Sequence, residues 1–175
     1  MRKKTGRKLE ILFCLLVSVG STFAVAQPSK EGIEKVREEW TKSFNSKNLT
    51  KLMSLYADDA AIMPPTGERI VGKEKVAAYF KQLFDSATAV DAKVASESIY
   101  AAGELGYDSG TYEQTVTRSG AMISGNVAIS GNVKIQGGGS RSISSGSYLV
   151  VLKYKSNNWL IVEQASTQKP QQSAP

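Results

Sequence analysis

Residues 40–72 carry the pattern that decides the fold, and they read WTKSFNSKNLTKLMSLYADDAAIMPPTGERIVG. Trp40 and Phe44 open this stretch as the last apolar members of a run that recurs at helical spacing from Ile33. The run predicts a helix over residues 29–44, with lysines and glutamates on its opposite face. The remainder of the stretch holds the elements that follow this first helix.

A short second helix is predicted to begin at Asn48, since an asparagine side chain can accept from the free N–H groups of a helix N-terminus. The apolar stripe of this helix comprises Leu49, Leu52, Met53 and Tyr56. We expect Asp58-Asp59 to end the helix and residues 60–63 to form a brief strand. Pro64-Pro65 then stops the strand, because proline cannot donate to a strand ladder.

The chain after Gly72 predicts a third helix followed by strands. The helix runs to Asp85-Ser86, and its apolar residues again recur at helical spacing. Alternating apolar residues and turn residues predict strands over residues 90–100, 105–117, 147–155 and 159–166. A tight turn at residues 156–158 is expected to join the last two strands.

The last two predicted strands have apolar residues at both odd and even positions, which indicates a sheet that is covered on both faces. Three helices can cover only one of these faces. We therefore expect a symmetric homodimer whose second subunit covers the other face, since two-fold dimers are the commonest closed assembly.

The order of helix, short helix, strand and proline-glycine turn, closed by Val71-Gly72-Lys73, resembles the SnoaL-like and ketosteroid-isomerase-like proteins of the nuclear transport factor two-like superfamily. The resemblance covers roughly residues 31–118 and 143–166. It implies an α+β fold in which three N-terminal helices pack on a strongly curved, mainly antiparallel sheet and form a cone with a central pocket. We expect this domain to span residues 27–168, followed by a disordered tail at 169–175.

The segment of about residues 119–145 departs from the pattern of these proteins. It contains a tandem hexapeptide, SGNVAI at 124–129 and SGNVKI at 130–135. Gly-Asn turns between alternating Val and Ile predict a hairpin arm, which either folds over the pocket as a lid or crosses to a partner subunit; a plain glycine-rich loop is the alternative. Gly137-Gly138-Gly139 and Ser144-Ser145-Gly146 are the expected hinges.

Residues 1–26 have the features of a secretory signal peptide. A basic cluster precedes an apolar run at residues 11–19, and Ala24-Val25-Ala26 offers a cleavage site before Gln27. The apolar run is too short to span a membrane as a stable anchor. The sequence therefore predicts a secreted or periplasmic protein that begins at Gln27 and has no stable membrane anchor after cleavage.

Charge and composition exclude several classes of function. Residues 1–26 carry five basic side chains and one acidic side chain, so their removal lowers the net charge from +6 to +2. No basic stripe interleaved with aromatic residues follows, and nucleic acid is not an expected partner. The sequence has no histidine, and its single cysteine, Cys14, lies within the predicted signal peptide. Histidine- and thiolate-based catalysis and metal binding are thereby excluded, and we expect no metal and no cofactor.

The best candidates for the lining of the implied pocket are residues that would face the cone interior and contact a small apolar organic molecule. They are Trp40, Tyr56, Met63, Phe80, Tyr112 and Tyr148. Aromatic residues on helical stripes are more often core residues than ligand contacts, and that alternative applies to Trp40, Tyr56 and Phe80.

Ketosteroid isomerases use an aspartate base together with a tyrosine and a protonated aspartic acid. On the resemblance, these three positions hold Pro64, Trp40 and Val150, and none of them can take the corresponding role. The sequence is therefore interpreted as a small-molecule-binding domain without ketosteroid isomerase activity. One alternative is a protein-interaction module that acts through residues 121–140. The other is an isomerase or lyase with a pocket carboxylate, for which the candidates are Glu68, Glu97, Glu104 and Glu113.

Overall fold

The computed structural model describes residues 28–65, 67–120 and 139–169. Helices α1 (Lys30–Asn45), α2 (Leu49–Ser54) and α3 (Lys73–Ser86) accompany one sheet. Its strands are β1 (Tyr56–Met63), β2 (Ile70–Val71), β3 (Ala89–Ala102), β4 (Leu105–Arg118), β5 (Ser140–Lys155) and β6 (Asn158–Ser166). The predicted α+β fold with three helices before the long strands is confirmed.

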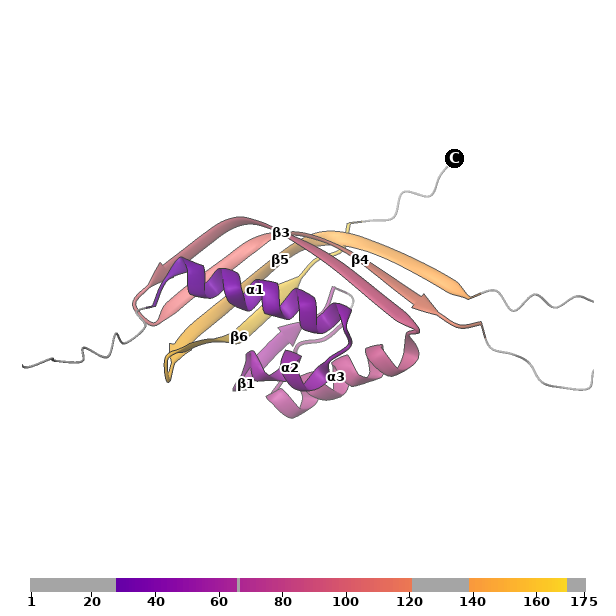
Figure 1. Ribbon diagram of the computed structural model, residues 1–175, viewed down its shortest axis with the longest axis horizontal. Helices are drawn as coiled ribbons and strands as arrows, with labels where there is room; N and C mark the ends of the chain where they lie inside the picture. Colours follow the sequence, from indigo (N-terminus) through magenta and orange to yellow (C-terminus); the bar gives the residue numbers. More distant parts are fainter. Residues whose placement is uncertain (1–27, 66, 121–138, 170–175) are drawn as a thin grey trace, which may run out of the picture.

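The sheet has the order β2-β1-β6-β5-β4-β3, and every neighbouring pair is antiparallel except β1 with β6. Figure 1 shows that the long strands β3, β4 and β5 arch and that all three helices lie on the inner side of the arch. A register shift between Ser96 and Ser98 lies within this arch. Such irregularities bend a strand and increase its twist. Gly110 lies opposite Ser96, where an added Cβ would lie 2.0 Å from the carbonyl oxygen of Ala95, so the bend requires a glycine there.

The N-terminal helix packs closely against the sheet. Ser29 caps its N-terminus, with the backbone N–H of Gly32 donating to Oγ of Ser29 over 3.3 Å. Ile33 is fully buried, and a Cβ at Gly106 of β4 would lie 2.5 Å from its Cδ1 atom. Helix α1 can therefore approach β4 at this point only because residue 106 has no side chain.

The core lies between the helices and the concave face of the sheet. Aromatic rings from α1 and α3 form its centre: Trp40 stacks on Phe44 at a centroid distance of 5.0 Å, and Phe44 meets Phe84 edge to face at 5.5 Å. Phe80 contacts Trp40 and Phe44 from α3, at 6.4 and 6.3 Å. Burial of these rings supplies a large share of the driving force that holds the two helices on the sheet.

The second helix is shorter than predicted, and the prediction that Asp58-Asp59 ends it is wrong. It ends at Ser54, Tyr56 is the first residue of β1, and both aspartates lie exposed within that strand. The backbone N–H of Ile161 donates to the carbonyl of Leu55, and Tyr56 pairs with Ile161 in parallel register. From residue 55 the chain therefore pairs with β6 as a strand, although its apolar residues recur at helical spacing.

Strand β5 begins at Ser140, well before the predicted start at Ser147. Residues 140–146 pair with β4 throughout, so Ser144-Ser145-Gly146 forms part of a ladder and the prediction of a hinge there is wrong. The glycine has a different purpose. A Cβ at Gly146 would lie 1.7 Å from the carbonyl oxygen of Thr167 and 3.1 Å from the ring of Tyr112. Close packing over β5, rather than flexibility, explains this glycine.

The chain after β6 is held to the sheet for a few residues. The backbone N–H groups of Thr167 and Lys169 donate to the carbonyls of Ser147 and Ser145, so the predicted disordered tail does not begin at residue 169. The predicted turn between β5 and β6 is confirmed, with Ser156 and Asn157 in the left-handed region as this type of hairpin requires.

Several predictions fall on residues outside the described part of the chain. These are the signal peptide at 1–26, the hairpin arm with its tandem hexapeptide at 124–135, the hinge at 137–138 and the tail at 170–175. Within the described ranges, no helix is long and apolar enough to cross a membrane.

Candidate functional site

A cavity of about 340 Å³ lies between the helices and the concave face of the sheet, a size in the range of small-molecule sites. Its walls come from α1, α3, the end of β1 and the inner faces of β3, β4, β5 and β6. Apolar side chains dominate the inner part: Val36, Trp40, Phe44, Phe80, Leu83, Val94, Val116 and Val150. The exposed members of the lining mark the mouth: Met63, Pro65, Ser142 and Gln168. The cavity is thus an apolar chamber with a partly polar rim.

Five of the six pocket residues predicted from the sequence line this cavity; they are Trp40, Met63, Phe80, Tyr112 and Tyr148. Tyr56 does not, because it is fully buried behind the wall. Contact of these residues with a ligand stays a prediction.

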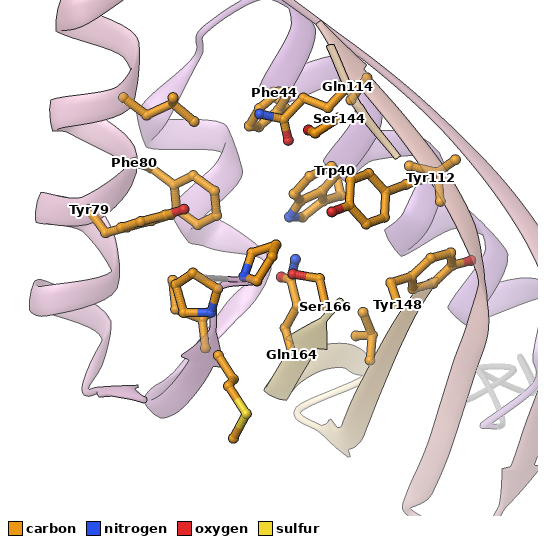
Figure 2. A pocket seen from close by; sticks show the side chains of 18 of the residues that line it. Trp40, Phe44, Tyr79, Phe80, Tyr112, Gln114, Ser144, Tyr148, Gln164 and Ser166 are labelled. Carbon is orange, nitrogen blue, oxygen red and sulfur yellow. The ribbon is translucent and has the colours of Figure 1, made fainter. Parts of the chain in front are cut away.

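Two tyrosines extend over the concave face of the sheet from the neighbouring strands β4 and β5. The hydroxyl of Tyr112 donates to the carbonyl oxygen of Thr167 over 3.1 Å, which places its ring across Gly146 of β5. Figure 2 shows the rings of Tyr112 and Tyr148 on one side of the cavity, facing Tyr79 and Phe80 from α3 on the other. Aromatic faces on both sides suit a flat ligand.

A chain of hydrogen bonds runs behind the wall from α1 to β6. The indole Nε1–H of Trp40 donates to the hydroxyl of Tyr56 over 2.8 Å, and that hydroxyl donates to Oε1 of Gln164 over 2.5 Å. Gln164 lines the cavity, and Figure 2 shows its side chain pointing inwards below the indole of Trp40. Tyr56 therefore acts as a buried link between a wall aromatic and a wall amide.

A buried carboxylate, Asp108 on β4, lies at the cavity wall and is absent from the sequence-based candidates. Its Oδ2 accepts from the guanidinium of Arg37 at 3.0 Å. Its Oδ1 accepts from the hydroxyls of Ser96, at 2.5 Å, and Tyr148, at 3.1 Å. Both oxygens are thus engaged by donors from α1, β3 and β5, which makes Asp108 the point where these elements are tied together.

The local environment keeps Tyr56 and Tyr148 neutral. Burial, followed by the negative charge of Asp108, raises the pKa of Tyr148 well above its ordinary value. Burial likewise raises the pKa of Tyr56, against a smaller opposing effect of the hydrogen bond from Trp40. Neither phenol is therefore an anion at neutral pH, and each offers one proton, which it donates to a neighbouring side chain.

The glutamates considered as catalytic carboxylates do not meet at the cavity. Glu68, Glu97, Glu104 and Glu113 are all exposed, and none is part of the lining. Pro64 and Val150, which stand at the isomerase acid and base positions by resemblance, do line it. Among the described residues, no group of three or more His, Cys, Asp or Glu side chains could hold a metal ion.

A family model for the SnoaL-like domain matches residues 37–133. The chain belongs to the SnoaL-like family. The matched range includes Arg37, Trp40 and Asp108, whereas Tyr148 and Gln164 lie beyond it. The family resemblance read from residues 40–72 is thereby confirmed.

Several solved structures have the same fold as this SnoaL-like domain. A conserved protein from Planctomyces limnophilus has 19% identity and a TM-score of 0.63, with 80% of this chain and 95% of that chain covered. A ketosteroid isomerase-like protein from Erwinia carotovora atroseptica has 14% identity and a TM-score of 0.58, with 81% and 97% covered. A nuclear transport factor 2-like superfamily protein from Salmonella enterica has 14% identity and a TM-score of 0.63, with 82% and 93% covered. At these identities the likeness concerns the fold.

A comparison of this SnoaL-like sequence with curated proteins finds no match.

Proposed function

We propose that this SnoaL-like protein binds a small, largely apolar organic molecule in the cavity on the concave side of its sheet. The observation that carries the proposal is the lining itself, an apolar chamber of about 340 Å³ with aromatic side chains from both helices and strands. Small-molecule sites have this composition: mostly apolar walls with a few placed polar groups. Trp40 and Phe80 would contact one part of the ligand, and Tyr112 another.

Binding without ketosteroid isomerase chemistry fits the state of the cavity carboxylate. A general base needs a free lone pair within hydrogen-bonding reach of the proton that it removes. Ser96 and Tyr148 occupy both lone pairs of Oδ1, and Oδ2, which keeps one lone pair, is held against the guanidinium of Arg37. Asp108 therefore supports the wall, and Tyr148 directs its only proton towards Asp108 rather than towards a ligand.

An isomerase or lyase activity is the second candidate, because a buried carboxylate paired with a tyrosine does lie at the wall. For catalysis, Arg37 or Tyr148 would have to release Asp108 when substrate binds. A 3-oxo-Δ5-steroid provides the test. We expect no turnover, whereas turnover that Asp108→Asn abolishes would establish the enzyme in place of the binding protein.

Native mass spectrometry of the protein as purified tests the binding function. We expect an added mass that corresponds to one small molecule per chain and that is released on unfolding. Substitution of Tyr112, a half-buried residue of the lining, by aspartate would place a charge in the chamber, and the variant should lose the added mass while keeping its secondary structure. An added mass that survives this substitution would contradict binding in the cavity.

We also propose that the protein is exported and that the mature chain begins at Gln27, on the strength of the basic cluster, the apolar run and the Ala24-Val25-Ala26 site. The intact mass of the exported form should lack residues 1–26. Retention of these residues would contradict cleavage.

A further inference from the structure

We infer that the cavity recognises a carbonyl oxygen of a neutral ligand through the side-chain amide nitrogen of Gln164. The inference rests on the proposed binding function and adds the chemical class of the ligand. It follows from the direction of the hydrogen bonds from Trp40 through Tyr56 to Gln164.

The direction of these bonds is fixed by the chemistry of their first member. An indole nitrogen can only donate, so Trp40 must donate to the hydroxyl of Tyr56, 2.8 Å away. A phenol has one proton, and the only other partner of the Tyr56 hydroxyl among the described residues is Gln164, at 2.5 Å. Because Tyr56 is neutral and fully buried, it must donate that proton to the amide. The amide oxygen of Gln164 is therefore the atom that faces Tyr56.

The amide nitrogen of Gln164 then carries two N–H donors on the cavity side. Within the described residues, no group accepts a hydrogen bond from this nitrogen. A ligand that fills the chamber removes water from these donors, and a desolvated donor without a partner costs free energy. A ligand with an acceptor atom at this place avoids that cost. Since the amide cannot rotate without breaking the bond from Tyr56, the site discriminates acceptors from donors.

The charges beside Gln164 favour a neutral acceptor over an anion. Arg118, the other cation of the lining, lies ten residues along β4 from Asp108, whereas Gln164 is level with Asp108 through Val150 of β5. The guanidinium of Arg37 is already paired with Asp108, whose carboxylate lies at the same wall. The ring of Phe80 lies 6.1 Å from that of Tyr56 and 6.4 Å from that of Trp40, so the surface beside the amide is aromatic. A carbonyl oxygen on a flat apolar body, as in an aromatic or alicyclic ketone, ester or amide, fits both features.

Three naphthalenes of similar size test the inference by calorimetry: 2-acetylnaphthalene, 2-ethylnaphthalene and 1-(2-naphthyl)ethanol. The wild-type protein should bind the ketone about tenfold more tightly than the hydrocarbon, the effect of one hydrogen bond in a desolvated site. The variant Gln164→Met retains the length of the side chain but has no donor. It should bind ketone and hydrocarbon with equal affinity.

The variant Gln164→Glu tests more strictly whether the side chain at position 164 must donate a hydrogen bond to the ligand. Its carboxylate can still accept from Tyr56, but it offers acceptors instead of donors to the cavity. We therefore compare the ratio of the ketone's dissociation constant to the alcohol's. This ratio should be about tenfold or more higher in Gln164→Glu than in the wild type. Gln82→Glu, the same change at an exposed position of α3 away from the lining, is the matched control and should leave the ratio unchanged.

The outcomes distinguish a failure of the carbonyl inference from a failure of the proposed binding function. If the wild type binds ketone and hydrocarbon equally well, the carbonyl inference is overturned while binding in the cavity stands. If the wild type binds neither, the proposed function itself is overturned. A ketone preference that persists unchanged in Gln164→Met would place the donor elsewhere and overturn the role of Gln164.

Discussion

Arg37 on α1 and Asp108 on β4 form an ion pair of 3.0 Å in which the carboxylate side chain is 3% exposed and the guanidinium side chain 20%. The pair joins a helix to the arch of the sheet at the cavity wall, and Ser96 and Tyr148 complete the hydrogen bonds of the carboxylate. Because the pair is largely shielded from water, it differs in kind from the exposed ion pairs of this protein.

Substitution of Asp108 by asparagine should destabilise the fold by about 2 kcal/mol, because it leaves the charge of Arg37 without its partner in a largely buried place. Urea unfolding measures the change. Glu163→Gln is the matched control, since it removes a carboxylate from the bidentate pair with Arg69, which is largely open to solvent. The control should cost less than about 1 kcal/mol. Equal losses in the two variants would contradict a special role of Asp108.

Substitution of Tyr56 by phenylalanine should cost about 1–3 kcal/mol, since the indole N–H of Trp40 then loses its acceptor behind the wall. Tyr107→Phe removes the same hydroxyl group from an exposed contact with Ser98 and should change the free energy of unfolding by less than about 0.5 kcal/mol. Both variants are compared by urea unfolding. A Tyr56→Phe variant as stable as Tyr107→Phe would show that the chain of bonds from Trp40 to Gln164 contributes nothing.

The buried tyrosines predict a loss of stability at alkaline pH. The pKa values of Tyr56 and Tyr148 in the folded protein lie above the ordinary value of 10.0. Between that value and the raised pKa, the unfolded chain releases protons that the folded chain keeps, so stability falls as the pH rises. Below about pH 9 both states hold these protons and the effect vanishes. Urea unfolding between pH 8 and pH 11 should show a shallower decline in Tyr148→Phe than in the wild type; an identical decline would contradict the shift.

We propose that a second copy of the chain covers the convex face of the sheet. The apolar residues on both faces of β5 and β6 predict such a dimer. Leu149 on β5 is 44% exposed, and Tyr100 and Leu105 near the turn between β3 and β4 are 53% and 58% exposed. Leu149→Lys should turn a dimer into a monomer in sedimentation at micromolar concentration. Ala78→Lys, at an exposed position of α3, should leave the assembly unchanged. A wild-type monomer would contradict the proposal.

Local signals predicted the helices well because they act within one turn. Asn48 caps α2 through a bond from the N–H of Lys51 to its Oδ1, as an asparagine before an apolar run should. The same local reading extended α2 too far, because the pairing of Tyr56 with Ile161 lies outside any local window. Long-range strand pairing overrode the helical stripe.

The two polar residues that distinguish the site were harder to find. Asp108 shares its parity in β4 with Gly106, Gly110 and Tyr112, and an inward-facing aspartate among them was a signal that could have been used. Gln164 could not be placed this way. The register between β5 and β6 shifts between Val151 and Leu152, so inward positions along β6 do not keep a single parity.

The binding of a neutral carbonyl compound in the cavity is tested most directly by the indole N–H signals in nitrogen-15 correlation spectra. The protein has two tryptophans, and the indole of Trp159 donates to the carbonyl of Ser29 at the start of α1, outside the cavity lining. Addition of 2-acetylnaphthalene should shift the Trp40 signal and the side-chain amide signals of Gln164 in a saturable way, while the Trp159 signal stays in place. No saturable shift of the Trp40 signal, or a shift of the Trp159 signal alone, would contradict binding in this cavity.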